Sequence, residues 1–419
     1  MAALSSKPEI NPELKSFFSG MYESIQDKAR SLLSETDGRF PIWGLFILFG
    51  LIIGLLVWYF KRIALFESVD NIRSIAKSST KAQVGYDMAN PDRVGLRAYL
   101  AALKKQGVPD AHLCLTNFYV STVNAAGVFF PATDGVVSPM AARAAVLGGA
   151  RAFVLDIWPD LTPGAQFAPS IQVVESGSLW RRISMNSLPF VSILKALMQE
   201  AFEIDGRPGS EDPVFLYLRF RGKPRASTYT GTANALRAVL ESYRLDASYN
   251  TCRGQDRIFS APITSLFNKV VIMSNTHANG NVLSDYINVG PKDGVKLEWG
   301  INEARGLTSD RKATAIRTIQ QNLSWIAPFS EDPDAEKNTW DYQLSQNIGV
   351  QFCALNFWNN TDKLKSYMTM FGKQSFAIKP ESLRYVIEVL PTPKYPQDPG
   401  WGTGTTAGSP TIPPAIRLP

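Results

Sequence analysis

The feature that most limits what this chain can fold into is an uncharged apolar stretch, FPIWGLFILFGLIIGLLVWYF, at residues 40–60. At a rise of ~1.5 Å per residue, a helix of this length extends about 30 Å, which is the hydrocarbon thickness of a bilayer. Aromatic residues stand near both ends, as in the interfacial belts of membrane helices; they are Phe40, Trp43, Trp58, Tyr59 and Phe60. The stretch therefore predicts a single transmembrane helix, with the lipid bilayer as a partner.

Two properties of this span stay open. Basic residues flank it almost equally, so the positive-inside rule does not tell which side of the membrane the rest of the chain faces. Gly50 and Gly54 form a GxxxG pattern that favours a homodimer by close helix approach, although glycine is common in spans in any case. Because residues 1–39 precede the span and no small-residue cleavage site follows it, we expect an anchor that is retained.

The two ends of the chain differ in composition from its middle. Residues 1–39 contain ELKSFFSGMYESIQDKARSLLSE, whose apolar residues recur at helical spacing. This predicts an amphipathic helix that lies on a membrane or packs on a partner, with a frayed polar tail as the alternative. Residues 391–419 are rich in Pro and Gly, which predicts an extended arm. We expect both ends to bind protein partners.

The charge and cysteine content exclude several classes. The net charge is +6 with no long basic run, which favours a solvated basic surface, with attraction to an anionic membrane as the second interpretation. No nucleic-acid-binding motif is present. The three cysteines, Cys114, Cys252 and Cys353, are too few and too widely spaced for a disulfide framework or a zinc cluster.

The middle of the chain alternates short apolar runs with helical patterns. The runs typical of buried parallel strands are ARAFVLDIW (150–158), PVFLYLRF (213–220), NKVVIMSN (268–275) and GVQFCALNF (349–357). Helices are predicted at 188–202 and 230–245, and a helical connector at 61–108 with its clearest part at 93–107. This order predicts an α/β barrel at 109–390. Asp156, Arg219 and Asn275 stand toward the carboxyl ends of these runs, so we expect them to point into one mouth.

Five blocks within this region resemble a known family. They are LTNFYVSTVNAAG (115–127), AVLGGARAFVLDIW (145–158), LPFVSILKALMQEAF with the strand after it (188–202), GVQFCALNFWN (349–359) and FAIKPESLR (376–384). In this order they resemble the two halves of the catalytic barrel of eukaryotic-type phosphoinositide-specific phospholipase C. The resemblance implies a (β/α)8 barrel of the TIM type.

The resemblance also implies a chemistry whose residues this chain lacks. The family cleaves a phosphodiester with two histidines and a calcium ion held by Asn, Glu, Asp and Glu. In this chain Val123 and Ser176 stand at the two histidine positions. Asn124 and Asp156 remain at ligand positions, whereas Val154 and Arg219 replace the two glutamates. Met273 and Asn275 replace two lysines that would bind substrate phosphates.

These departures predict a lost calcium site and no cofactor. Because clustered carboxylates repel one another without a metal, exchanging one for a guanidinium leaves a neutral pair. We therefore expect a salt bridge between Asp156 and Arg219 at the barrel mouth. His112 and His277, the only histidines, are expected to be surface residues rather than relocated catalysts.

Three functions remain open. The first is a membrane-anchored, catalytically inactive barrel that tethers a membrane to a larger assembly, such as a virion with an inner membrane or an organelle scaffold. The second is a pseudoenzyme that binds anionic lipid headgroups through Arg219 and Arg221 without cleaving them. The third is an enzyme of different chemistry that uses Glu175, Ser176 and Tyr217, or one that retains phosphodiester hydrolysis.

Overall fold

The computed structural model divides the chain into two units, residues 1–79 and 80–419. The residues that it describes are 49–57, 93–124, 136–159, 187–204, 206–221, 223–251, 257–276, 280–291, 298–326, 340–357 and 361–385, together with Glu23, Asp27 and the backbone of four short strands. The statements below concern these residues.

The first unit is described almost only at residues 49–57, which form a helix with exposed side chains. Within the described parts of the chain, no helix is both long enough and apolar enough to cross a membrane. Most of the predicted span at 40–60 and of the predicted amphipathic segment at 1–39 lies outside the described residues. The anchor and the dimer through Gly50 and Gly54 therefore stay predictions.

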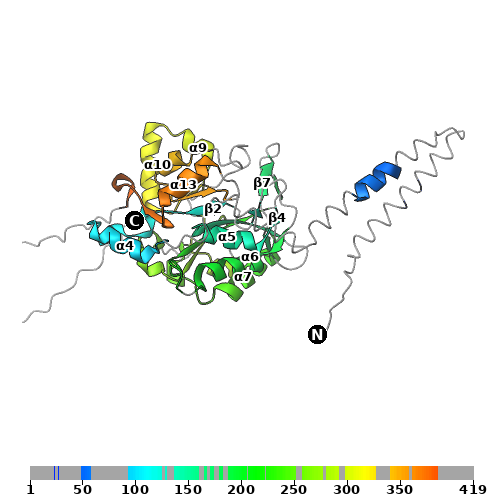
Figure 1. Ribbon diagram of the computed structural model, residues 1–419, viewed down its shortest axis with the longest axis horizontal. Coiled ribbons are helices and arrows are strands. Elements are labelled where there is room, and N and C mark those ends of the chain that lie inside the picture. Colours follow the sequence, from blue (N-terminus) through cyan, green and yellow to red (C-terminus); the bar gives the residue numbers. More distant parts are fainter. Residues whose placement is uncertain are drawn as a thin grey trace, which may run out of the picture. The chain divides into compact units, whose positions relative to one another are not determined.

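The second unit is built on a curled sheet of seven parallel strands (Figure 1). Their order in the sheet is β11-β10-β5-β2-β14-β13-β12. Their bounds are β2 Thr122–Asn124, β5 Ala152–Pro159, β10 Val214–Phe220, β11 Val270–Ser274, β12 Glu298–Trp299, β13 Trp325–Ile326 and β14 Phe352–Leu355. A parallel bridge between Met273 and Val289 adds one more position beside β11. Read from β2, the strands follow one another around the sheet in chain order, which is the arrangement of a TIM-like α/β fold.

Helices cover the outer surface of this sheet. In Figure 1, α5, α6 and α7 lie under one part of it and α9, α10 and α13 over another. Their bounds are α5 Pro139–Leu147, α6 Phe190–Phe202, α7 Ala226–Leu240, α8 Arg257–Ser260, α9 Ile301–Arg305, α10 Ser309–Gln321, α12 Tyr342–Gln346 and α13 Asp362–Phe371. The predicted helix at 188–202 is confirmed as α6, and the one predicted at 230–245 is α7, which begins and ends a few residues earlier.

Short antiparallel pairs complete the second unit. They are β3 (Val128–Phe129) with β4 (Val136–Val137), β7 (Ser170–Val173) with β8 (Leu179–Arg182), and β6 (Ala165–Phe167) with β5 and β9 (Leu188–Pro189).

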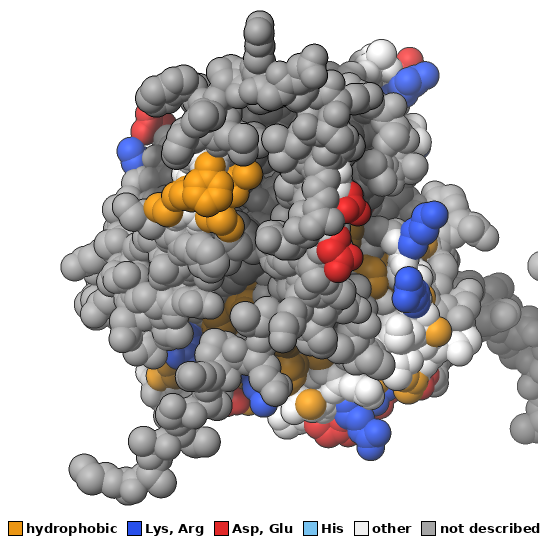
Figure 2. Space-filling model, turned by 90° about the vertical axis from the view of Figure 1, so that its right-hand side faces the viewer, with side chains coloured by type: hydrophobic (Ala, Val, Ile, Leu, Met, Phe, Trp, Pro, Cys, Tyr) orange, Lys and Arg blue, Asp and Glu red, His pale blue; other side chains and the backbone are white. Residues whose placement is uncertain are grey.

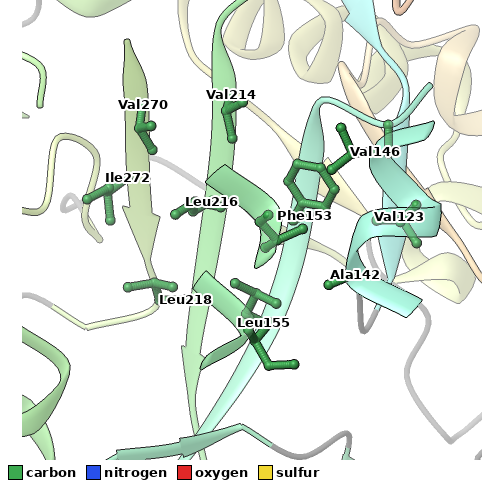
Figure 3. Close-up of a cluster of buried hydrophobic side chains, with 14 of the residues drawn as sticks. Val123, Ala142, Val146, Phe153, Leu155, Val214, Leu216, Leu218, Val270 and Ile272 are labelled. Atoms are coloured by element: carbon green, nitrogen blue, oxygen red, sulfur yellow. The ribbon is translucent and has the colours of Figure 1, made fainter. Parts of the chain in front are cut away.

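Side chains of each strand alternate between two apolar layers. The outer layer packs against the helices, and Figure 3 shows Phe153 and Leu155 of β5 beside Ala142 and Val146 of α5. The inner layer fills the barrel with aromatic rings: Trp325 stacks on Tyr217 with ring centroids 5.0 Å apart and on Phe352 at 4.2 Å. The barrel interior is thus a packed core and not a channel.

The floor of the barrel, at the amino ends of the strands, is closed by two further elements. Helix α4 (Leu96–Lys105) buries its leucines in the same core as the barrel's inner layer. Strand β1 (Phe118–Val120) pairs antiparallel with β15 (Phe376–Ile378). The sequence assigned α4 to a connector at 61–108, but by its contacts the helix packs as part of the barrel.

Candidate functional site at the barrel mouth

The carboxyl ends of β5 and β10 bring Asp156 and Arg219 together. The two residues are register partners in adjacent parallel strands, so their side chains leave the sheet on the same side. Arg219 Nε donates to Asp156 Oδ1 at 2.7 Å, and its Nη2 donates to Oδ2 at 3.3 Å. Both side chains are buried, with exposed fractions of 2% and 1%. The predicted salt bridge between them is confirmed.

Two further charged residues, which the sequence did not place in this pair, belong to the same cluster. Arg221 Nε donates to Asp156 Oδ1 at 3.2 Å, and the Arg221 side chain is only 6% exposed. Arg219 Nη1 lies 3.7 Å from Oε1 of Glu298, the first residue of β12. The cluster therefore contains two guanidinium groups and two carboxylates, and its formal charges balance.

Neutral side chains extend the cluster in two directions. Tyr217 Oη donates to Glu298 Oε2 at 2.6 Å from inside the barrel. Asn124, the last residue of β2, accepts from Arg219 Nη2 at 3.3 Å. Its Nδ2 donates to Asn356 Oδ1 at 2.9 Å, just beyond β14. Hydrogen bonds and ion pairs thus join residues in, or just beyond, five strands across the mouth.

Burial and neighbouring charges set the protonation of these groups. Loss of hydration and the adjacent Glu298 carboxylate raise the pKa of Tyr217 well above its ordinary value, so the phenol keeps its proton. For Arg219, desolvation opposes the charged form, but attraction to Asp156 and Glu298 outweighs it and raises the pKa. For Arg221, desolvation and the nearby Arg219 charge lower the pKa. Asp156 is thus balanced chiefly by Arg219.

The other predicted site positions are distributed differently. Val154 lies inside the barrel and is fully buried. Val123 faces the opposite way, into the outer layer against α5 (Figure 3), because neighbouring residues of a strand point to opposite faces. Glu175, Ser176 and His277 lie outside the described residues. His112 lies at the floor, where its Nδ1 is 3.5 Å from Arg384 Nη1.

Asn275 was expected to point into the mouth with Asp156 and Arg219. It lies directly after β11, beside the carboxyl end of β10. Asn275 Oδ1 accepts from the backbone N of Phe220 at 2.8 Å, and its Nδ2 donates to the Phe220 oxygen at 3.3 Å. The amide therefore satisfies the backbone at the end of β10. Met273, the other residue expected at a lysine position, is buried in the barrel, where Trp325 Nε1 contacts its sulfur at 2.9 Å.

The described charged side chains on one face of the molecule are mixed in sign. On the face drawn in Figure 2, the described Lys and Arg side chains lie interspersed with acidic ones. Among the described residues, no three His, Cys, Asp or Glu side chains are grouped closely enough to hold a metal ion.

Comparison with known proteins supports the fold. No family model and no curated protein matches the sequence. Solved structures do match: PLC21 of L. pealei with a TM-score of 0.51 and PLC21 of S. officinalis with 0.52, each at 15% sequence identity over 66% of this chain. This chain covers only 38% of either of those chains. A calcium-dependent phosphoinositol-specific phospholipase C from Pseudomonas sp. also matches, at a TM-score of 0.40 and 11% identity over 65% of this chain and 97% of its own.

The chain therefore has the fold of a phospholipase C-like barrel. The resemblance expected from the sequence is confirmed at this level, and so is the α/β barrel class.

Proposed function

We propose that the barrel is a non-catalytic binding and tethering domain. The observation that carries the proposal is the burial of Asp156, a residue at a family ligand position, between the two guanidinium groups of Arg219 and Arg221. A carboxylate held in this way has its charge already compensated. It has little left to offer to a metal ion or to a reacting group.

The donors in the cluster do not suit calcium. Calcium needs six to eight oxygen ligands, mostly anionic. Asp156, Glu298 and Asn124 provide oxygens, but Arg219 interacts with all three. A divalent cation among them would lie beside a buried guanidinium, and the repulsion between these like charges would be weakly screened. The proposal therefore includes no calcium and no other cofactor.

Acid–base cleavage also lacks its proton carriers in this proposal. Val123 has no titratable group, and His112 lies at the opposite end of the barrel. A tyrosine whose pKa is raised well above its ordinary value and whose proton is held by Glu298 is a poor general base near neutral pH.

The tethering role rests on the segments outside the barrel. The span expected at 40–60 would anchor the chain in a bilayer, with the side of the membrane open. The segments at 1–39 and 391–419 would bind protein partners in an assembly such as a virion with an inner membrane or an organelle scaffold. A tethering role of this kind requires a stable barrel and no catalysis at its mouth.

Calorimetry on the full-length protein in detergent tests the proposal. Calcium is titrated first and an inositol phosphate second, and hydrolysis of phosphatidylinositol vesicles is measured in parallel. We expect no calcium heat and no hydrolysis. In the R219E variant a third carboxylate replaces the guanidinium, so calcium binding that appears only in this variant would identify Arg219 as the group that excludes the cation.

Two outcomes would redirect the assignment. Calcium-dependent hydrolysis by the wild-type protein would overturn the proposal and support the alternative of an active phosphodiester hydrolase. Heat from the inositol phosphate alone would favour a binder of anionic headgroups, and the R221M variant would then be expected to lose it. The burial of both arginines makes this second outcome the less favoured one.

A further inference from the structure

The floor of the barrel holds a buried lysine that has no counterion among the described residues. Lys379, which follows β15, is 0% exposed. Its Nζ has no hydrogen-bond partner among the described residues. A buried ammonium without a partner is strongly disfavoured, so burial favours the neutral amine.

Among the described residues, no carboxylate lies close enough to Lys379 to balance a positive charge. The amine lies over the Tyr119 ring, 5.8 Å from its centroid. The titratable groups that influence it electrostatically are the thiols of Cys114 and Cys353. Burial raises the pKa of both thiols, so neither is a thiolate near neutral pH.

Lys379 begins a short segment, residues 379–385, that lies across the floor and that we call the latch. Hydrogen bonds attach it at several points. Lys379 N donates to the backbone oxygen of Asn117 at 2.9 Å. The Asn117 side chain donates to Tyr385 O at 2.9 Å and accepts from Tyr385 N. Gln320 Nε2 donates to the Ser382 and Arg384 oxygens at 3.1 and 3.2 Å.

Other charged groups of the latch face outward or bind its own backbone. Glu381 is exposed. Arg384 Nε donates to Lys379 O at 2.7 Å, and Arg384 Nη1 lies near His112. The polar attachments of the latch are therefore neutral hydrogen bonds. Lys379 is the one latch residue whose protonation would directly destabilise the closed position. His112 is the second group to be tested.

We propose that residues 379–385 form a pH-sensitive latch, which stays closed on the barrel floor while the Lys379 amine is neutral and opens when that amine is protonated. The latch ends shortly before the Pro/Gly-rich segment at 391–419. Its opening would change how that segment is connected to the barrel, independently of anything at the mouth.

The direction and range of the pH effect follow from linkage. Desolvation lowers the pKa of Lys379 from 10.5 to about 7 in the closed state. A depressed lysine pKa destabilises the closed state as pH falls from 10.5 toward 7, and a further fall below 7 adds little. Between pH 9 and pH 7.5 the opening equilibrium is expected to rise roughly 20-fold. His112, which lies near Arg384 of the latch, is the second titratable group there, and substitution separates its effect from that of Lys379.

Hydrogen exchange on the full-length protein tests the latch. Protection of peptides covering 376–385 is measured from pH 9 to pH 5.5, corrected for intrinsic exchange, with peptides of β10 as the reference. We expect protection of the latch to fall roughly 20-fold between pH 9 and 7.5 and then to level off. Protection of β10 should stay constant.

Three variants decide which group is responsible. K379M should remove the pH dependence, whereas K365M, at an exposed lysine of α13, should keep it. H112Q should keep it as well. A flat wild-type profile between pH 9 and 7.5, persistence of the effect in K379M, or its loss in H112Q would each overturn the proposal. If K379M does not fold, the wild-type profile and H112Q still give the answer.

Discussion

At the scale of single residues, Arg219 is the group on which the barrel mouth depends. It is nearly inaccessible, yet it interacts with Asp156, Glu298 and Asn124, which come from three different strands. Burying charges is expensive, and only the mutual attraction of the partners offsets that cost. Removing one partner should therefore cost more than the ion pair itself contributes.

The R219M variant measures how much Arg219 contributes to the stability of the barrel. It leaves Asp156 with Arg221 and leaves Glu298 without its nearby guanidinium, so the free energy of unfolding should fall by roughly 3–5 kcal/mol. Urea denaturation measures the change. The control, R311M, removes an arginine from the exposed face of α10 and should change stability by less than ~0.5 kcal/mol. Equal stability of the two variants would show that the cluster does not stabilise the barrel.

A second substitution in the R219M background separates the partners. Replacing Asp156 with asparagine there removes the charge left in excess at the mouth. The double variant should recover part of the loss, with a coupling energy of roughly 1–3 kcal/mol. Additive effects in the cycle would contradict the ion pair as the source of the stability.

The Asp156–Arg219 contact could be predicted from the sequence, whereas the rest of the cluster could not. Both residues stand toward the carboxyl ends of recognisable strand patterns, and the carboxyl ends of parallel strands meet at one edge. Glu298 stands in a strand of two residues that has no clear apolar run, and its contact with Arg219 depends on how tightly the sheet curls. Asn356 is the last residue but one of a predicted strand, so its position at the mouth was a signal that sequence reasoning missed. Nothing in FAIKPESLR indicates that Lys379 is buried, because the latch creates that environment.

At the scale of elements, α4 shows how close packing fixes a helix onto the floor. Leu96 N donates to Asp212 Oδ1 at 2.8 Å, which satisfies a free amide of the first helical turn. Gly95, the residue before the helix, approaches Gly209 so closely that an added Cβ would lie 2.8 Å from the Gly209 nitrogen. A backbone atom cannot move aside as a flexible side chain can.

The G95A variant tests this contact. The methyl group would push α4 off the floor or displace the Gly209 backbone, so we expect a loss of roughly 1–3 kcal/mol in thermal or urea denaturation. G300A is the matched control, because a Cβ at Gly300 would meet its nearest neighbour at 3.8 Å, an ordinary contact. A loss in G95A no larger than in G300A would mean that the approach of α4 is looser than the structure has it.

At the scale of the whole molecule, the sequence predicted the strands and helices of the barrel better than the residue at which the folded unit begins. Four strands and two helices were recognisable because each is a continuous apolar run or a clear helical repeat. Helix α4 was assigned to a connector because its amphipathic pattern is equally typical of a helix that packs elsewhere. Only the structure shows that Leu96, Leu100 and Leu103 are buried in the barrel's inner core.

Because α4 packs into the barrel core, a fragment must include α4 in order to fold. A fragment of residues 80–419 contains the whole second unit, whereas one of residues 109–419 starts at the boundary that the sequence indicated and lacks α4. Losing three buried leucines at roughly 2–5 kcal/mol each would be comparable to the total stability of ~5–15 kcal/mol that a typical domain has. The shorter fragment would also lose Arg93, whose guanidinium donates to Val146 O and to Ser375 Oγ across the floor. We therefore expect a single cooperative thermal transition from the longer fragment and none from the shorter one, as measured by calorimetry. A cooperative transition from both would place α4 outside the folding unit and leave the floor to be closed by β1, β15 and the latch alone.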